Sequence, residues 1–291
     1  MQIVCFDTET TGLDVQKEHI IQLSLVKFDT DNWQITDQRD WYILPEGKFD
    51  IPAEAQAVHH ITKEFLMERG VRLRDVFEDF KSFVGDHDML SYNGNGFDAP
   101  LLHYNLKRLG LDFSFDNRVW YDALTLERIH MDGKTDPATG ERYHCNLTAT
   151  YTRYYGHPFE GAHNSLDDVL ATIEVFKAQV SEHGWEWAKR DDFGFISFDR
   201  WLTKKGGQFL LNQGNRKGQS LEEVLESDRN YLEWLVDKCS WTDAQTKEIV
   251  GPLIGRPIRP AKPKEANIQK PVSRGKKRSK GTISEADLCL F

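Results

Sequence analysis

The sequence has few cysteines and no long apolar run, and both absences exclude classes of protein. Its four cysteines, Cys5, Cys145, Cys239 and Cys289, lie far apart without a C-x-x-C pair. This spacing supports neither a zinc site nor a disulfide framework. No stretch of eighteen or more apolar residues is present, and the N-terminus lacks a charged segment followed by an apolar one. We therefore expect a cytoplasmic protein that is neither secreted nor anchored in a membrane.

Positive charge is scarce over most of the chain. The net charge is −9, yet residues 256–280 contain ten Lys or Arg and one acid, Glu265, so this segment carries +9. Removing that +9, and the −2 of Glu285 and Asp287, from the total leaves −16 for residues 1–255. An acidic body with a basic arm fits a body that binds metal and an arm that binds phosphate. A solvated linker explains the arm equally well.

The apolar residues predict an α/β fold for the first part of the chain. Three strands joined by short connections come first, which predicts an antiparallel meander. Strands and helices then alternate, so we expect a mixed sheet flanked by helices. The five expected strands cover approximately residues 3–6, 20–28, 41–44, 89–92 and 119–121.

The chain divides into three expected parts. The first, residues 1–184, contains the sheet and its helices. Residues 185–255 are predicted to form a small α+β module that includes a strand at Phe209–Leu211 and two helices. Residues 256–291 contain several prolines and many basic residues but few large apolar side chains, so we expect a disordered tail.

Two acids lie at the end of the first predicted strand. Asp7 and Glu9 are two positions apart, so their side chains share one face of the strand. Carboxylates this close repel each other unless a cation lies between them, and hard oxygen ligands suit Mg²⁺ or Mn²⁺. Taken alone, the pair is equally compatible with an ordinary acidic exit from a strand into a turn.

A third acid, Asp98, stands at the start of a predicted helix, after Asn93 and a glycine-containing stretch. It could cap that helix, with Pro100 in the first turn. Capping and metal binding are compatible, so this motif does not decide between them.

A further acid lies at the start of a later helix. The apolar stripe of this helix begins at Leu166 and leaves Asp168 in the first turn, away from the stripe. His163 precedes the helix and could fold back toward the same space, although a histidine in this position more often caps a helix or lies at the surface. Asn164 and Asp167 form a plausible capping pair, which gives Asp167 a structural interpretation.

Together, and in this order on an α/β outline, the motifs resemble the DEDDh branch of the DnaQ-like exonucleases, which have an RNase H-like fold. This group includes polymerase proofreading subunits, exodeoxyribonuclease X and ribonuclease T. The five-residue spacing from His163 to Asp168 separates the branch from its Tyr-using relatives and selects Asp168 over Asp167 as a ligand. His60 stands where a glycine is common. The matching segments are Phe6–Gly12, Ala57–Thr62, Phe97–Asp98 and His163–Asp168.

The resemblance implies a metal-dependent 3′→5′ exonuclease. Asp7, Glu9, Asp98 and Asp168 would hold two Mg²⁺ ions, with Mn²⁺ able to substitute, and His163 would act as general base on the attacking water. Attack on the last phosphodiester would release a nucleoside 5′-monophosphate.

The same resemblance implies residues that contact the terminal nucleotide of the substrate. Thr10 and Leu13 would line its pocket, although a turn position and a core position would explain them equally well. His59 and Thr62 lie on a neighbouring loop that would touch the nucleotide, and Asn93 is a further candidate.

Residues Phe209–Trp234 resemble the small C-terminal module of exodeoxyribonuclease X-like proteins. Aromatic and basic residues interleave in this segment, which is compatible with binding of single-stranded nucleic acid. Tyr231, Trp234 and Leu235 recur at helical spacing, however, and we favour core positions for them.

The segment Glu285–Phe291 presents Leu288, Leu290 and Phe291 after a polar stretch. It resembles the short peptide by which replication proteins attach to sliding clamps, with Glu285 where Gln is typical. We therefore expect a sliding clamp, or a replicative polymerase, as a partner of this segment. The alternative is that the segment packs against its own domain.

Three functions are compatible with these residues. The leading one is removal of nucleotides from single-stranded or frayed 3′ ends of DNA, in proofreading or repair. The same chemistry could act on RNA ends or oligoribonucleotides. A non-catalytic adaptor for nucleic acid or a clamp is the third, and the presence of all five active-site residues argues against it.

Overall fold

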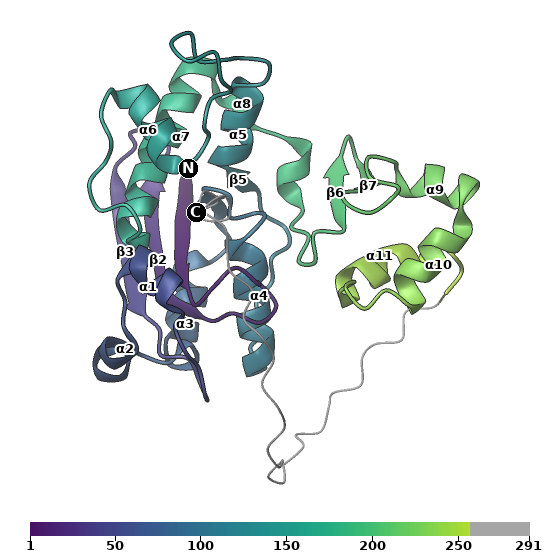
Figure 1. The fold of residues 1–291 in the computed structure, drawn as a ribbon, viewed down its shortest axis with the longest axis horizontal. Coiled ribbons are helices and arrows are strands. Elements are labelled where there is room, and N and C mark those ends of the chain that lie inside the picture. The colour runs from purple at the N-terminus through teal and green to yellow at the C-terminus, as the bar shows by residue number, and fades with distance from the viewer. Residues whose placement is uncertain (257–291) are drawn as a thin grey trace.

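The computed structural model describes residues 1–256 of the 291-residue chain, and a five-stranded mixed sheet forms its centre (Figure 1). The strand order is β3-β2-β1-β4-β5. The first three strands form an antiparallel meander, whereas β4 and β5 run parallel to β1. The strands are β1 (Gln2–Thr10), β2 (Ile20–Asp29), β3 (Ile35–Tyr42), β4 (Asp88–Ser91) and β5 (Trp120–Asp122).

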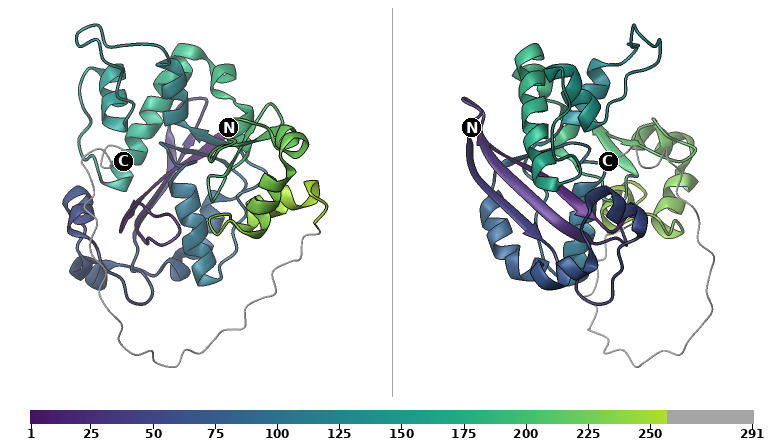
Figure 2. Two further views of the ribbon diagram at one scale, coloured as in Figure 1. Left: turned by 45° about the vertical axis from the view of Figure 1, so that its right-hand side comes forward. Right: turned by 60° about the vertical axis from the view of Figure 1, so that its left-hand side comes forward.

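Helices cover both faces of this sheet, which confirms the expected α/β class (Figure 2). Helices α3 and α4 pack on one face, and α5, α6 and α7 pack on the other. The helices of this part are α1 (Ala53–His59), α2 (Lys63–Arg69), α3 (Leu73–Val84), α4 (Asp98–Leu109), α5 (Ala123–His130), α6 (Leu147–Tyr155), α7 (Ser165–His183), α8 (Trp185–Ala188) and the 3₁₀ helix η1 (Asp191–Gly194).

The central strand β1 is buried on both of its faces, which explains its nearly continuous apolar sequence. Val4 and Phe6 belong to the core shared with α3 and α4, whereas Ile3 and Cys5 belong to the core shared with α7. Because side chains alternate along a strand, the odd-numbered acids that follow continue the face that α7 covers.

Two strand boundaries differ from the sequence prediction. The third strand covers Ile35–Tyr42 rather than 41–44, because β3 is an edge strand whose residues are mostly exposed and polar. Its apolar content therefore did not reveal it. The first strand does not end at Asp7: it pairs with β2 as far as Thr10, with a register shift after Glu9.

Residues from Trp201 onward form a smaller group of elements with a core of its own, built around Leu202, Val224, Leu232 and Val250. Leu235 is fully buried in this core and Tyr231 packs against it, as expected, whereas Trp234 remains 37% exposed. The elements are β6 (Leu202–Lys205), β7 (Gln208–Leu211), α9 (Leu221–Ser227), α10 (Arg229–Asp237) and α11 (Ala244–Leu253).

The smaller group contacts the sheet part of the molecule through α4. Phe198, which leads into this group and belongs to the core of α3 and α4, stacks on the His103 ring with the centroids 3.7 Å apart. Asp243 accepts hydrogen bonds from the Tyr104 hydroxyl and from Lys107 Nζ, each at 3.0 Å. The boundary expected at residue 184 remains a prediction, and the tail expected over residues 256–291 lies, beyond Arg256, outside the described residues.

None of the helices described between residues 1 and 256 is both long and apolar enough to cross a membrane.

Candidate active site

Strand β1 brings the first two predicted ligands together. Asp7 and Glu9 share the face of β1 that α7 covers, and Glu9 is only 7% exposed. A strand that is buried on both sides holds its side chains in fixed directions, so the two carboxylates cannot turn away from each other into water.

Asp98 reaches this place from the first turn of α4. Its Oδ1 accepts two hydrogen bonds from Thr8, one from the backbone N–H at 3.1 Å and one from the hydroxyl at 2.5 Å. The N-cap position belongs to Phe97, and no side-chain capping bond forms there. The capping interpretation of Asp98 is therefore wrong: the carboxylate is anchored on β1 instead of on its own helix.

A close approach of backbone segments makes this position of Asp98 attainable. A Cβ atom built on Gly94 would lie 2.2 Å from the Ser91 hydroxyl oxygen and 3.4 Å from Asp98 Oδ2. Only glycine therefore allows the chain leaving β4 to turn so tightly into α4.

The start of α7 brings the fourth carboxylate to β1. Asn164 caps the helix by accepting a hydrogen bond from the Leu166 N–H, as expected, but among the described residues Asp167 does not complete the expected pair with a bond back to Asn164. Ser165 Oγ donates to the carbonyl oxygen of Asp7 at 3.1 Å, which joins the helix end to β1. The His163 backbone N–H donates to Asp168 Oδ2 at 3.2 Å, so the histidine and the carboxylate are held side by side.

These elements place all five predicted catalytic residues around one pocket. One carboxylate oxygen from each of Asp7, Glu9 and Asp168 lies within 4.8 Å of the others. Asp98 and His163 line the same pocket, although Asp98 does not belong to that tightest group. The remaining lining residues are Thr8, Tyr92, Asn93 and Phe97.

The carboxylates are electrostatically strained in the absence of a cation. Burial, followed by the charges of its acidic neighbours, raises the pKa of Asp7 well above its usual range, and the same causes raise the pKa of Glu9. Burial also raises the pKa of Asp98 and of Asp168 to about 7. Within residues 1–256, no lysine or arginine forms a salt bridge with any of the four.

This arrangement fits divalent cations. Four carboxylates that repel one another, lie largely out of water and have no basic partner in the described chain are the donor set expected for hard metal ions. Asp7, Glu9 and Asp168 would hold a cation between them, and Asp98 would contribute its Oδ2 atom, since Oδ1 is occupied by Thr8.

His163 combines backbone strain with a lowered proton affinity. Its φ of 70° lies in the left-handed region, which places its side chain beside Asp168 at the pocket. Partial burial, and then the charge of His60, lower the pKa of His163 below its ordinary value. The lowered pKa favours the neutral imidazole, which is the form that can accept a proton.

The backbone conformation at His60 explains why a glycine is common at this position in the resembling family. His60 ends α1 with a φ of 59°, again in the left-handed region. Glycine adopts this conformation without strain, which is the physical reason for a glycine at this position. In this chain the position carries a second imidazole near His163.

Three of the predicted nucleotide-binding residues line an apolar pocket beside the carboxylates. Thr10, Leu13 and His59 surround it, and Glu9 belongs to both this pocket and the carboxylate pocket. Asn93 lines the carboxylate pocket but not the apolar one. Thr62 lines neither: its hydroxyl accepts a hydrogen bond from the Phe65 N–H and caps α2.

The sequence did not reveal the residues that hold the ligands in position. Thr8, Ser165 and Gly94 each act through contacts with residues that the chain brings close only after folding. Gly94 carried a usable signal, because a glycine between a strand and a helix often marks a close backbone approach. The roles of Thr8 and Ser165 had no such signal. Leu288, Leu290 and Phe291, expected to bind a clamp, lie outside the described residues.

A family match decides the assignment. The exonuclease family RNase_T matches residues 4–176, more than half of the chain. The chain belongs to this exonuclease family. The resemblance to DnaQ-like DEDDh exonucleases is confirmed, and so is the expectation of an enzyme, since exonucleases are hydrolases.

Individual relatives share the same region and fold. The chain is 24% identical over 178 residues to the DNA polymerase III subunit epsilon of Treponema pallidum, covering 61% of this chain and 76% of that protein. A solved structure of exonuclease I superposes with a TM-score of 0.57 at 15% identity, covering 83% of this chain and 60% of the other. The nuclease domain of 3′hExo, a DEDDh family member bound to rAMP, superposes with a TM-score of 0.51 at 18% identity, covering 64% and 94%.

Proposed function

We propose that this protein is a Mg²⁺-dependent 3′→5′ exonuclease that removes nucleoside 5′-monophosphates from single-stranded or frayed 3′ ends of DNA. The observation that carries the proposal is the pocket itself, where Asp7, Glu9, Asp98 and Asp168 meet beside His163 without a basic partner in the described chain. Such a set has no stabilising role, because the four carboxylates repel one another.

The pockets on the two sides of Glu9 give each part of the terminal nucleotide a place. The apolar pocket around Leu13 and His59 would receive the last nucleoside, which puts its 5′-phosphate at the carboxylates. Two Mg²⁺ ions bound there would supply electrostatic stabilisation of the attacking water and of the leaving oxygen, and Mn²⁺ would be able to substitute.

The residues of the chain supply the proton transfer and the orientation. An imidazole nitrogen of His163 accepts a proton as the water oxygen attacks phosphorus. The bond from phosphorus to the 3′ oxygen of the preceding nucleotide breaks, this oxygen takes a proton from solvent to become the new 3′ hydroxyl, and the His163 imidazolium returns its proton to solvent. Thr8 and Ser165 keep Asp98 and the start of α7 aligned with β1 through the reaction.

DNA is the substrate we favour, because the relatives of similar sequence include a DNA polymerase III subunit epsilon. RNA ends are the alternative, since 3′hExo, which shares the fold, is described bound to rAMP. A degradation assay with Mg²⁺ on 3′-labelled and 5′-labelled single strands of DNA and RNA distinguishes both polarity and sugar.

The catalytic assignment is tested with Asp7→Ala and Asp168→Ala. Each change should abolish hydrolysis of an end-labelled oligonucleotide while the protein remains folded, because removal of a clustered negative charge relieves repulsion. A folded variant that retains full activity would refute the assignment. A non-catalytic adaptor would bind the oligonucleotide and leave it intact even as the wild-type protein.

The same proposal includes a role in replication or repair, a cytoplasmic location and a partner protein. We infer that Glu285–Phe291 attaches the enzyme to a sliding clamp or a replicative polymerase, on the ground of its sequence alone. The test is deletion of Leu288–Phe291 followed by titration against a clamp. Unchanged affinity after the deletion contradicts the attachment but leaves the nuclease proposal intact.

A further inference from the structure

A cavity that borders the carboxylate pocket is lined by more basic than acidic residues, although the rest of the body is acidic. The cavity has a volume of about 450 Å³ and lies between α5 and the loop that leads to α6. Arg128, Lys134 and Arg142 line it, and Asp132 is the one acid among its lining residues. The first 255 residues carry a net charge of −16, so a concentration of basic residues here is contrary to the rest of the body.

The basic side chains of this cavity are available to a ligand. Within residues 1–256, none of Arg128, Lys134 and Arg142 forms a salt bridge with an acid; Lys134 Nζ lies 3.5 Å from His130 Nε2. Arg128 and Arg142 are exposed. Basic residues elsewhere on the body commonly have an acidic partner, as Arg39 has Asp79. An anion that entered the cavity would therefore meet three basic side chains that form no salt bridge with a described carboxylate.

The cavity adjoins the active site. Tyr92 and Asn93 line both the cavity and the carboxylate pocket. Their positions are fixed from the cavity side, since the Tyr92 hydroxyl donates to the Cys145 carbonyl oxygen at 2.5 Å and the Asn93 N–H donates to Asp122 Oδ1 at 3.0 Å. The wall between the two sites is thus built from hydrogen-bonded residues.

Three pockets consequently follow one another across the molecule. The apolar pocket shares Glu9 with the carboxylate pocket, and the carboxylate pocket shares Tyr92 and Asn93 with the basic cavity. A nucleic-acid strand whose last nucleoside occupies the first pocket and whose last phosphodiester lies in the second must leave on another side. The basic cavity lies next to the carboxylate pocket, on the far side of Tyr92 and Asn93, and offers phosphate groups a site close to the reacting bond.

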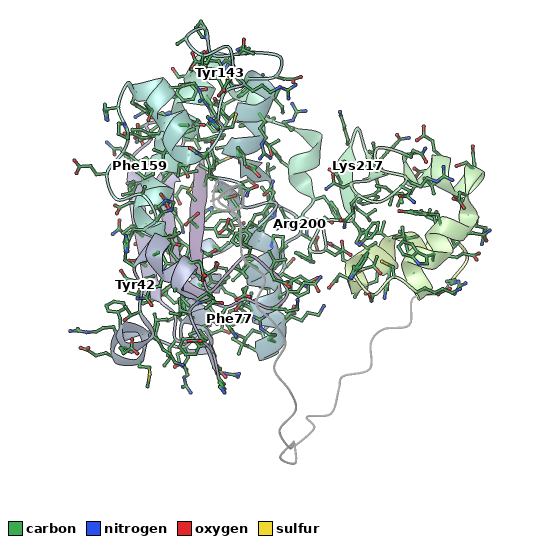
Figure 3. All side chains as sticks on the ribbon, in the orientation of Figure 1. Tyr42, Phe77, Tyr143, Phe159, Arg200 and Lys217 are labelled. Carbon is green, nitrogen blue, oxygen red and sulfur yellow. The ribbon has the colours of Figure 1, made fainter. Side chains whose placement is uncertain are left out.

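The loop of the cavity also carries an aromatic side chain. Tyr143 lines the cavity, and Figure 3 shows it on the segment between α5 and α6. The Arg153 guanidinium lies 5.3 Å from the centre of its ring, and the same guanidinium donates to the His144 carbonyl oxygen at 2.7 Å. The loop is therefore tied to α6 and presents an aromatic residue beside the basic ones, a combination suited to single-stranded nucleic acid.

We infer that this cavity binds the phosphates and bases of the strand immediately upstream of the scissile phosphodiester, with Arg128 and Arg142 as the principal phosphate contacts. The inference rests on the proposed nuclease function and assigns the direction in which the substrate leaves the active site. It predicts that the enzyme contacts several nucleotides of a single strand. The affinity for single-stranded DNA should therefore increase with strand length until the cavity is filled.

The test compares a long substrate with a minimal one. The long probe is a single-stranded oligodeoxynucleotide of twelve residues; the minimal probe is the p-nitrophenyl ester of thymidine 5′-monophosphate, which has no upstream nucleotide. The variants are Arg128→Gln and Arg142→Gln, both at exposed positions, and the control is Arg69→Gln at the exposed end of α2, which removes the same charge.

Each cavity variant should raise KM for the oligonucleotide roughly fivefold or more, with kcat nearly unchanged, because a phosphate contact contributes to binding along the whole strand. Hydrolysis of the p-nitrophenyl ester should match that of the wild-type protein. The dependence of binding on salt should weaken by about 0.7 in the log–log slope for each contact removed. The control should show none of these changes.

Two results overturn the inference: an oligonucleotide KM that neither cavity variant changes, or an equal loss on both probes, which means that the variants damage the active site itself. Failure of the proposed function has a different signature. In that case the wild-type protein hydrolyses neither probe, while fluorescence anisotropy of the labelled oligonucleotide still reports weaker binding by Arg128→Gln and Arg142→Gln than by Arg69→Gln.

Discussion

Thr8 donates two hydrogen bonds to a single carboxylate oxygen of Asp98, although ninety residues of sequence separate the two. Thr8 lies between Asp7 and Glu9 on β1, so one short segment supplies two ligands and positions a third. Both hydrogen bonds favour the charged form of Asp98 and oppose the rise in its pKa that burial causes. The threonine therefore tunes the site as well as orienting it.

Replacing Thr8 with valine should weaken the site without disrupting the strand. Valine has the same shape and a high strand propensity but cannot donate from its side chain, so the pKa of Asp98 should rise and the cation should bind less tightly. We expect kcat/KM to fall by about tenfold at limiting Mg²⁺, the equivalent of roughly 1.4 kcal/mol, with partial recovery at saturating Mg²⁺. Thr8→Ser, which retains the hydroxyl, is the matched control and should stay near the wild-type value. Equal activity of the valine and serine variants over a Mg²⁺ titration would show that the hydroxyl has no such role.

Gly94→Ala should impair activity far more than Gly96→Ala. The added methyl group at position 94 would lie 2.2 Å from the Ser91 hydroxyl oxygen and must displace the start of α4, together with Asp98. At position 96 the nearest contact is 3.3 Å, to the side-chain oxygen of Asn93, which can adjust. We expect a loss of about a hundredfold in kcat for the first variant, the effect of a displacement near 1 Å, and less than threefold for the second. Circular dichroism and melting curves establish that both variants are folded; similar kcat values for the two would contradict the role given to Gly94.

The sequence predicted those parts of the site that depend on local spacing. The two-residue interval of Asp7 and Glu9 places both on one strand face, and the family pattern selected Asp168 with His163. Contacts such as that of Ser165 with the Asp7 carbonyl could not be predicted, because 158 residues separate the partners and a serine at the first turn of a helix is common. Strand β3 was misplaced for a related reason: an edge strand is held by backbone pairing, which leaves little trace in its apolar pattern.

The pH dependence of the reaction should report the neutral form of His163. Because burial and the neighbouring His60 lower its pKa in the free protein, the acid limb of kcat/KM should lie below the ordinary histidine value of about 6.5. His163→Gln should reduce kcat by about 10²–10⁴ and flatten this limb. A limb of unchanged position and steepness in the glutamine variant would assign the base to another group.

His60→Gly should raise the pKa of His163, and it leaves the four carboxylates of the pocket unchanged. Glycine accommodates the φ of 59° at this position, so the protein should remain as stable as the wild type or gain slightly. Loss of the second imidazole removes one cause that lowers the pKa of His163, so the acid limb should move to higher pH. The pH profile of kcat/KM for His60→Gly, measured beside that of the wild type, checks this; a limb displaced to lower pH would contradict the pairing of the two histidines.

The metal-free protein should lose stability as the pH rises from about 4 to about 7, and divalent cations should restore it. Folding raises the pKa of Asp98 and Asp168 to about 7, so the folded state holds protons that the unfolded chain has already released near pH 4. Stability then falls with pH across this interval, by about 1.4 kcal/mol for each tenfold difference in proton affinity.

Burial lowers the pKa of His59 and His103 to about 4 and gives an opposite trend, so the informative quantity is the difference between the wild-type protein and Asp168→Asn. In EDTA, the Tm of the wild type relative to this variant should decline as pH increases, by about 2–4 °C for each kcal/mol. Mg²⁺ should remove the decline by replacing the protons with a cation, and a Tm difference that does not change with pH or with Mg²⁺ would mean that the four carboxylates are not a metal site.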